Sequence, residues 1–202
     1  MILENNKPIR IIGYPESSMT DGCMHWISLE SKNEIEIITP DVFFKLTNKF
    51  DYQYIVAFSL DMNLRKQVCD EIDNIELDCI TYIHDSSIIF DTSVIGKGVL
   101  ICGQSIVAYH AIIRDHCWIE MSLISHHTIL GRGSVVHVGT LIAGKVTIGE
   151  NCTFGFKSSV IDKVNITDNV TIGGYSNVTK DITRSGRYVG SIARYVGSIY
   201  EY

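Results

Sequence analysis

The sequence predicts a parallel β-helix preceded by a small α/β unit with a parallel sheet. Two observations predict the β-helix: an apolar residue recurs at every sixth position between residues 88 and 178, and the residue four positions later is mostly small or β-branched. A third observation sets the N-terminal part apart, because the first 83 residues lack this period and alternate strand-like with helix-like segments. We therefore expect three segments, 1–83, 84–183 and a C-terminal tail over 184–202.

The apolar series has a period that ordinary secondary structure does not produce. A helix repeats its apolar face about every 3.6 residues and a strand about every 2. A hexapeptide repeat is typical of β-helices, whose short strands gain a core only by stacking on their neighbours. A run of ordinary antiparallel strands would lose this phase within a few hexads. The series consists of Ile88, Val94, Leu100, Ile106, Ile112, Trp118, Ile124, Leu130, Val136, Ile142, Ile148, Phe154, Val160, Ile166, Ile172 and Val178.

The position four residues after each apolar residue predicts a tight inner corner, because its residues leave little bulk there. Three hexads complete one triangular coil, so residues eighteen apart in the sequence should lie on neighbouring rungs, about 4.8 Å apart. The small or β-branched members are Thr92, Gly98, Ser122, Thr128, Ser134, Thr140, Val146, Cys152, Ser158, Val164, Val170 and Ser176.

The first 83 residues predict a small Rossmann-like sheet. The clearest helical segment runs from Met62 to Asp73, with Asp61 as its N-cap. An order of strand, helix and strand favours parallel pairing, and parallel sheets bind ligands beyond the carboxyl ends of their strands. The expected strands are 8–13, 35–39, 52–58 and 77–83.

The loops after the first and third of these strands form the candidate substrate edge, with Gly13, Tyr14, Ser17 and Ser59 as candidate substrate-binding residues. The first loop, GYPESSMTDGCMHW, lacks the GxGxxG of dinucleotide-binding proteins, so a nicotinamide or flavin enzyme is not expected. Ser17 and its neighbours could cap a following helix and present amides to a phosphate. The alternative is that these polar residues are only solvated.

Composition excludes several classes of function. The net charge of −6 argues against nucleic acid as a partner, since phosphate binding needs a concentrated basic face. The six cysteines are scattered without zinc-like spacing, so buried free thiols are expected and no metal. No segment approaches the roughly 20 apolar residues of a membrane span, and the N-terminus lacks the layout of a signal peptide. We therefore expect a cytoplasmic protein that binds no membrane.

Two adjacent histidines are the candidate catalytic residues. His126 and His127 follow Ile124 and Ser125 at positions where side chains point outward, and an outward histidine on a rigid wall suits proton transfer. Gly144 lies eighteen residues after His126, so its backbone N–H is expected to be open to a ligand atom. Histidine would then take a proton from an attacking amine or hydroxyl while the amide stabilises charge on a thioester oxygen.

Two other histidines and a duplicated tail complete the inventory. His110 and His116 fall at the small inner corner in this register, where a packed or rim role is expected. The hexapeptide RYVGSI occurs at residues 187–192 and again at 194–199, and its arginines bring positive charge next to the last coil. A polyphosphate ligand could use that charge, and a simple duplication is the alternative.

Continuous motifs then carry a resemblance over residues 84–196. ISHHTILGRGSVVHVGTLIAGKVTIGENCTFGFKSSVI, VTIGGYSNVTKDI and SGRYVGSIAR resemble the left-handed β-helix acyltransferases that modify nucleotide-linked amino sugars. Sialic acid O-acetyltransferases and the N-acetyltransferases of UDP- or GDP-linked 4-amino sugars belong to that family. The N-terminal unit shares their strand order and the LRKQV helix, but its similarity is weaker.

The resemblance implies acetyl-CoA as co-substrate and a homotrimer with sites between subunits. It implies that His126 is the general base, with His127 in support. The implied cofactor-binding residues are Gly144, Phe156, Lys157, Gly174 and Arg194. The implied reaction is N-acetylation of a 4-amino-4,6-dideoxysugar linked to UDP or dTDP, as a step of glycan biosynthesis.

Three departures and three alternatives accompany this resemblance. A carboxylate usually follows the base histidine, but this chain has His127 there; the first loop lacks the usual glycines and histidines; and Ile192 replaces a proline. O-acetylation of a sialic-acid-like sugar is the alternative within the class. A γ-type carbonic anhydrase would need a histidine pair five residues apart, which the coils lack. A non-catalytic binding solenoid would need neither an outward histidine beside a glycine nor an attached sheet.

Overall fold

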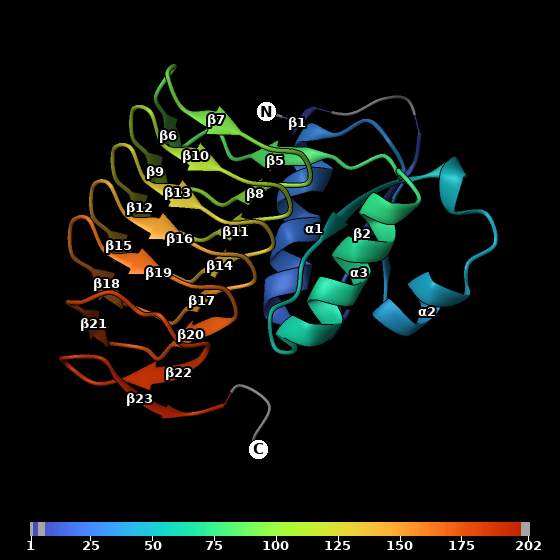
Figure 1. Cartoon of the computed structure of the whole chain (residues 1–202). Coiled ribbons are helices and arrows are strands. Elements are labelled where there is room, and N and C mark those ends of the chain that lie inside the picture. The colour runs from blue at the N-terminus through green and yellow to red at the C-terminus, as the bar shows by residue number, and fades with distance from the viewer. Residues whose placement is uncertain (1, 4–6, 199–202) are drawn as a thin grey trace.

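The computed structural model describes residues 2–3 and 7–198 and shows a triangular parallel β-helix with an α/β unit packed against one side (Figure 1). We name its sheets by position. The docked sheet faces the α/β unit, the groove sheet carries an open groove, and the third sheet completes the triangle. The predicted β-helix and small parallel sheet are both confirmed.

Each sheet is built mainly from parallel rungs, most of them two residues long, and the two edge strands of the docked sheet pair antiparallel. The docked sheet has nine strands, β1(Ile2–Leu3), β5(Thr81–Ile83), β8(Leu100–Ile101), β11(Trp118–Ile119), β14(Val135–Val136), β17(Thr153–Phe154), β20(Val170–Ile172), β22(Gly186–Val189) and β23(Arg194–Gly197). The groove sheet contains β6(Ile88–Ile89), β9(Ile106–Val107), β12(Leu123–Ile124), β15(Leu141–Ile142), β18(Ser159–Val160) and β21(Asn177–Val178). The third sheet contains β7(Val94–Ile95), β10(Ile112–Ile113), β13(Ile129–Leu130), β16(Thr147–Ile148) and β19(Asn165–Ile166).

The sequence suggested an unbroken repeat of six, but the residues that face the inside of the coil break this repeat once. The buried residue of each rung advances in steps of six to Ile119 and then by five to Ile124. The strand register shows the same step, because Trp118 pairs with Leu100 eighteen residues before it but with Val135 seventeen residues after it. The short step lies at Met121, whose φ of 37° departs from an extended backbone.

The first six members of the predicted series therefore do not face the coil interior. Ile88 and Val94 are 56% and 57% exposed, and Leu100 and Trp118 pack into the core shared with the α/β unit. The series counted in the sequence follows outward-facing residues up to Trp118 and inward-facing residues from Ile124 on. Its period of six therefore stays intact although the coil is one residue shorter between them.

The same phase change moves two histidines out of the inner corner. His110 and His116 occupy the turn position with φ of 58°, as His127 does with 57°, while Ala111 and Cys117 are the buried corner residues. His110 thus lies next to His127 on neighbouring coils. The predicted corner placement of His110 and His116 was wrong by one residue.

The α/β unit has a three-stranded parallel sheet in the order β3-β2-β4, formed by β3(Ile35–Ile38), β2(Ile9–Ile12) and β4(Gln53–Val56). Three predicted strands are confirmed. The fourth contributes only a bridge between Cys79 and Tyr54 before the chain enters the docked sheet as β5. The division at residue 83 stays a prediction. Strand β5, which ends there, already belongs to the docked sheet of the β-helix.

The helices are α1(Ser18–Glu30), α2(Pro40–Lys45), α3(Met62–Asn74) and the short 3-10 helix η1(Lys49–Asp51). Asp61 caps α3 as predicted, accepting hydrogen bonds from the N–H groups of Asn63 and Leu64 at 3.0 and 2.9 Å. Helix α1 covers the docked sheet, where Cys23 and Ile27 pack against its outward residues. None of the helices in residues 2–3 and 7–198 has the length and apolar character required to cross a bilayer.

The two copies of RYVGSI fold onto each other at the end of the coil. Strand β22 continues the docked sheet, and β23 returns antiparallel to it, with Tyr188 opposite Tyr195 and their rings 5.5 Å apart. The guanidinium of Arg184 lies 4.1 Å from the centre of the Tyr195 ring. The duplication thus forms a β-hairpin at the end of the coil. The end of the second copy, Ile199, lies outside the described residues.

Candidate functional site

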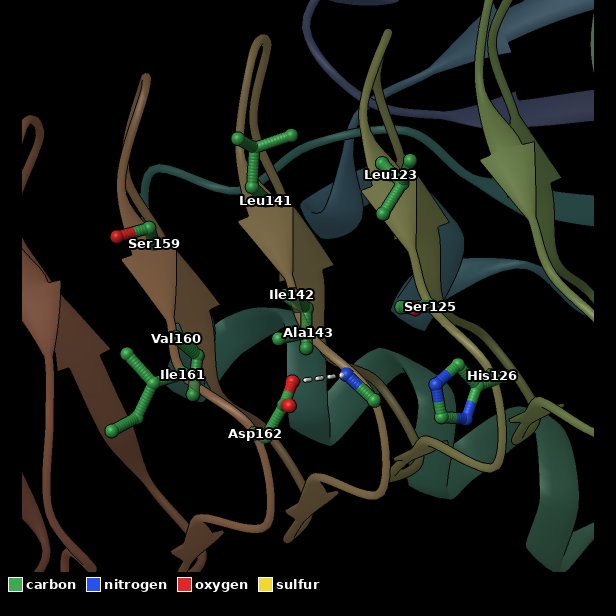
Figure 2. A pocket seen from close by; sticks show the side chains of 11 residues that line it. Leu123, Ser125, His126, Leu141, Ile142, Ala143, Ser159, Val160, Ile161 and Asp162 are labelled. Carbon is green, nitrogen blue, oxygen red and sulfur yellow. Dashed lines mark hydrogen bonds between the residues drawn. The ribbon is translucent and has the colours of Figure 1, made fainter.

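An open groove of about 760 Å³ runs along the groove sheet beside the turns that lead to the third sheet (Figure 2). We call these turns the groove corner. The groove is lined by Leu123, Ser125, His126, Leu141, Ile142, Ala143, Gly144, Ser159, Val160, Ile161 and Asp162. Its lining is mainly apolar with a few polar groups, which is typical of a ligand site.

The imidazole of His126 is held between the coil before it and the coil after it. On one side the ring stacks on Tyr109, with ring centres 5.2 Å apart and planes 10° apart. On the other side it lies against Gly144, where an added Cβ would come within 2.5 Å of Nε2. Only glycine leaves room for the ring in this position, so the structure confirms the predicted stacking of His126 on Gly144.

His127 contacts His126 through their ring nitrogens. The two Nδ1 atoms are 3.2 Å apart, a hydrogen bond in which one ring donates and the other accepts. Desolvation, His110, His126 and Lys145 all lower the pKa of His127, and the ring of His110 lies 4.9 Å away. Because three of these influences are basic neighbours, His127 favours the neutral form and can orient His126 without supplying a negative charge.

The backbone N–H of Gly144 is not open to a ligand, contrary to the expectation from the sequence. It donates a hydrogen bond to Oδ1 of Asp162, one coil further on, at 3.1 Å (Figure 2). The exposed Asp162 side chain reaches back along the corner, as the eighteen-residue stacking allows. Sequence reasoning missed Asp162, although counting a second coil from His126 through Gly144 would have reached it.

The implied cofactor-binding residues do not all share this groove. Phe156, Lys157 and Gly174 lie at the turns between the docked sheet and the groove sheet, which we call the far corner. Phe156 is 54% exposed, and Nζ of Lys157 lies 5.6 Å from the centre of the Tyr175 ring. Arg194 begins strand β23 at the end of the coil and is exposed. Their cofactor roles stay predictions.

The far corner also holds a carboxylate–imidazole pair that the sequence did not reveal. Oε2 of Glu120 lies 2.8 Å from Nδ1 of His137, and both side chains are nearly buried, at 11% and 12% exposed. The ring of His137 lies 5.3 Å from that of Phe156. The two residues are seventeen apart, so an unbroken repeat would have placed them out of register.

The candidate substrate edge forms at the carboxyl ends of β2 and β4. An added Cβ at Gly13 would come within 2.6 Å of the Thr20 side chain, which donates a hydrogen bond to the carbonyl of Ala57 at 2.8 Å. Ser17 precedes α1 without a side-chain cap bond, and Ser59 is partly buried. The edge therefore exists, but none of its residues lines the groove.

Tyr14, at this edge, lies near several carboxylates. The ring of Tyr14 packs against Phe58, with centres 5.8 Å apart. Burial and then Asp41, Asp61 and Glu16 raise the pKa of Tyr14. The substrate-binding roles of Gly13, Tyr14, Ser17 and Ser59 stay predictions.

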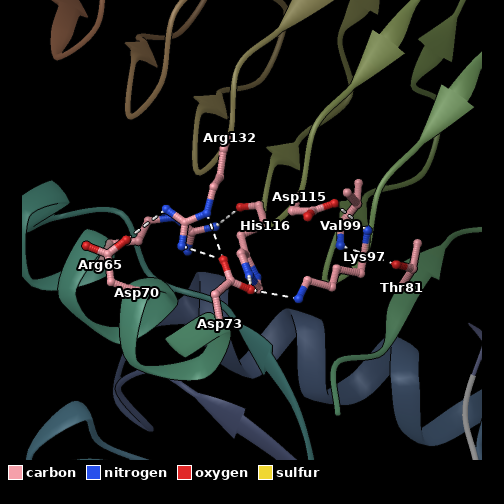
Figure 3. A network of polar contacts seen from close by, with 9 residues as sticks. All are labelled: Arg65, Asp70, Asp73, Thr81, Lys97, Val99, Asp115, His116 and Arg132. Atoms are coloured by element: carbon pink, nitrogen blue, oxygen red, sulfur yellow. Dashed lines mark hydrogen bonds and ion pairs between the residues drawn. The ribbon is translucent and has the colours of Figure 1, made fainter. Parts of the chain in front are cut away.

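A polar network fixes the α/β unit against the turns between the third and docked sheets, the docking corner (Figure 3). The buried Arg65 donates to the carbonyls of Val56 and Phe58 at 3.0 and 2.9 Å and to that of His116 at 2.7 Å. One guanidinium thus joins α3, β4 and the coil. His116 is fully buried, which agrees with its predicted structural role.

Asp73 is the centre of this network. Its carboxylate pairs with Lys97 at 2.8 Å, Arg132 at 2.7 Å and Nε2 of His116 at 3.0 Å. Burial opposes its ionisation, but these three partners outweigh that effect and hold the pKa of Asp73 well below its usual range. Burial lowers the pKa of His116, so a neutral imidazole donates to an ionised Asp73. Within residues 2–3 and 7–198 no three His, Cys, Asp or Glu side chains are grouped to hold a metal ion.

Sequence comparison relates part of the chain to curated acyltransferases, although no protein-family model matches. The UDP-3-O-acylglucosamine N-acyltransferase of Bordetella pertussis is 32% identical over 100 residues, which are 50% of this chain and 23% of that protein. That of Bordetella avium is 38% identical over 71 residues, which are 35% of this chain and 20% of that protein. The chain thus spans less than a quarter of the length of these relatives.

Structural comparison covers nearly the whole chain. The acetyltransferase domain of PglB from Neisseria gonorrhoeae matches with a TM-score of 0.85 at 16% identity, over 95% of this chain and 100% of that one. PerB from Caulobacter crescentus, in complex with CoA and GDP-perosamine, matches with a TM-score of 0.80 at 18% identity, over 94% and 97%. At such identities the likeness shows the fold, in which a small sheet unit precedes a hexapeptide-repeat β-helix.

Proposed function

We propose that this protein is an acetyl-CoA-dependent N-acetyltransferase that acts on the amino group of a nucleotide-linked amino sugar. The observation that carries the proposal is the imidazole of His126, clamped between Tyr109 and Gly144 at one end of an apolar groove. Such a ring is preorganised for proton transfer. PglB has been solved with acetyl coenzyme A, and PerB with CoA and GDP-perosamine, which supports the class of substrate.

The proposed reaction is direct transfer from the thioester. Acetyl-CoA would place its acyl end over Ala143 and Gly144, where the groove is lined by backbone and small side chains. His126 takes a proton from the acceptor nitrogen, the nitrogen attacks the thioester carbonyl, and the C–S bond breaks to release CoA. A hydrogen bond donated by Nδ1 of His126 to Nδ1 of His127 would leave the lone pair on Nε2 of His126 free to take a proton from the acceptor.

A homotrimer is part of the proposal, because the candidate residues of one chain do not meet. The far corner with Phe156 and Lys157, and the substrate edge with Gly13 and Ser59, contribute nothing to the groove of their own chain. Leu141 and Ile161 line that groove and are 55% and 47% exposed, so they offer apolar area to a neighbouring copy. A second subunit packed there would bring its own residues to His126.

The nucleotide and the sugar belong to the same proposal. We expect UDP or dTDP linked to a 4-amino-4,6-dideoxysugar, made and used in the cytoplasm for glycan assembly. The curated relatives act on a UDP-linked sugar by their names, which supports UDP.

Release of free CoA tests the proposal directly. Purified protein is given acetyl-CoA and a panel of UDP-, dTDP- and GDP-linked 4-amino sugars, with a sialic-acid-like sugar as the O-acceptor. We expect CoA release with at least one amino sugar and an N-acetylated product by mass spectrometry. No release from any amino sugar would contradict N-acetyl transfer, and release from the sialic-acid-like sugar alone would assign O-acetylation instead.

A further inference from the structure

Asp162 lies in the groove in line with His126 and Gly144. The three residues occupy the same position on successive coils of the groove corner, eighteen residues apart, so His126 and Asp162 lie on either side of Gly144. Among the eleven residues that line the groove, Asp162 is the one Asp, Glu, Lys or Arg. A ligand seated over Gly144 would therefore meet an imidazole on one side and a carboxylate on the other.

The carboxylate is only half used by the fold. Oδ1 accepts the hydrogen bond from the N–H of Gly144 at 3.1 Å, while no residue in the described part of the chain bonds to Oδ2. The side chain is exposed. Oδ2 is thus free to accept a hydrogen bond from a ligand without disturbing the bond that holds the side chain in place.

Part of this arrangement is a general feature of the coil. Oδ1 of Asp115 accepts from the N–H of Lys97 at 2.9 Å, and Oδ1 of Asp168 accepts from the N–H of Glu150 at 2.7 Å. Both bonds join residues eighteen apart at the docking corner, away from the groove. Stacking of the coils therefore explains the conformation of Asp162. It does not explain a carboxylate in an otherwise uncharged groove beside His126.

We propose that Asp162 selects an acceptor that carries a primary ammonium group and disfavours one that carries a hydroxyl at the same place. This inference rests on the proposed acetyl transfer and assigns its choice between nitrogen and oxygen to one residue. A charge-assisted hydrogen bond from the ammonium to Oδ2 is stronger than one from a neutral hydroxyl. A ligand seated in the largely apolar groove would exclude water from this carboxylate, which increases that difference relative to water.

The proton balance is consistent with this role. The acceptor binds as R–NH3⁺, gives one proton to His126 and attacks the thioester carbonyl as R–NH2. The nitrogen loses a second proton as the C–S bond breaks, and the departing thiolate takes it to form CoA. The products are the acetamide, CoA and one proton on His126, which returns to solvent. Asp162 takes no part in bond making.

The variants D162N and D168N form a matched pair. Asparagine keeps an oxygen to accept from the backbone N–H, so both variants retain the bond between coils, and only D162N removes charge from the groove. The values of kcat and KM are measured with acetyl-CoA and two acceptors, a nucleotide-linked 4-amino sugar and its 4-hydroxy counterpart. Thermal melting of both variants monitors the fold.

We expect D162N to lower kcat/KM for the amino acceptor by about tenfold or more, mainly through KM. Its kcat/KM for the hydroxy acceptor should stay within about twofold, and D168N should match the wild type with both acceptors. The wild-type KM for the amino acceptor should rise once the pH exceeds the pKa of its ammonium group, and D162N should lose that dependence.

Two outcomes would overturn the inference. One is wild-type KM for the amino acceptor in D162N, and the other is an equal loss for both acceptors. Neither outcome contradicts the proposed function as long as the wild type acetylates the amino acceptor. A wild type that acetylates neither acceptor would contradict the proposed function itself.

Discussion

The imidazole of His126 lies so close to Gly144, eighteen residues further along the chain, that a methyl group on Gly144 would come within 2.5 Å of Nε2. The stacking of one coil on the next thus fixes the position of the proposed base. A substitution at Gly144 should therefore act on catalysis through this contact.

Gly144→Ala should lower kcat by about 10²-fold, because the added methyl group forces the ring out of its position beside Tyr109. The flexible end of a side chain is displaced, so the melting temperature should fall by only a few degrees. Gly22→Ala in α1 is the control, because a Cβ there meets nothing within 4 Å. It should leave kcat unchanged and add about 0.5–1 kcal/mol of stability. Equal kcat in both variants would show that the contact does not position the base.

His127→Glu should move the acidic limb of the kcat/KM profile to higher pH by about one unit. A carboxylate at residue 127, where the present ring brings its Nδ1 within 3.2 Å of Nδ1 of His126, would favour the imidazolium form of His126. Since the base works in its neutral form, raising its pKa moves the onset of activity upward. His127→Gln keeps a hydrogen-bonding group without charge and should leave the limb in place. If the wild type and both variants have the same pH profile, residue 127 does not influence the proposed base His126.

The attachment of the α/β unit should weaken in acid. Burial lowers the pKa of His116, so its contribution begins to be lost as the pH falls below the unfolded value of about 6.5. The pKa of Asp73 is held low by Lys97, His116 and Arg132 against the effect of burial, so its contribution is lost further down, below about pH 4. Thermal melts between pH 8 and 3 should show both losses.

Substitutions should show that the Asp73 network contributes more to stability than an exposed ion pair does. Asp73→Asn should cost about 2 kcal/mol at pH 7 and remove the loss that occurs below pH 4. Lys66→Ala, which breaks an exposed pair with Asp70 within α3, should change stability by less than about 0.5 kcal/mol. Equal effects of the two substitutions would mean that Asp73 does not anchor the unit.

The sequence predicted the architecture well because the sixfold repeat of the coil and the helical spacing in α3 are both local patterns. The hexad alone indicated the β-helix, and the cap at Asp61 with the apolar positions after it indicated α3. The pairing of His126 with Gly144 followed from counting eighteen residues within a regular stretch.

The errors of register have a common physical origin at Met121, where the coil shortens by one residue. Each early rung carries one apolar residue that faces outward and one that faces the core, so the sequence alone did not show which of the two lies inside the coil. That ambiguity displaced His110 and His116 by one position and hid the pair of Glu120 and His137. The occupied N–H of Gly144 depends on which way the Asp162 carboxylate turns, and sequence spacing does not set a side-chain torsion.

The most direct test of the central claim is kcat for His126→Ala with acetyl-CoA and the preferred amino sugar. We predict a loss of at least about 10²-fold, with the melting temperature and the binding of CoA close to those of the wild type. Turnover within about threefold of the wild type would contradict His126 as the base. The carboxylate-oriented His137 at the far corner would then take its place as the candidate.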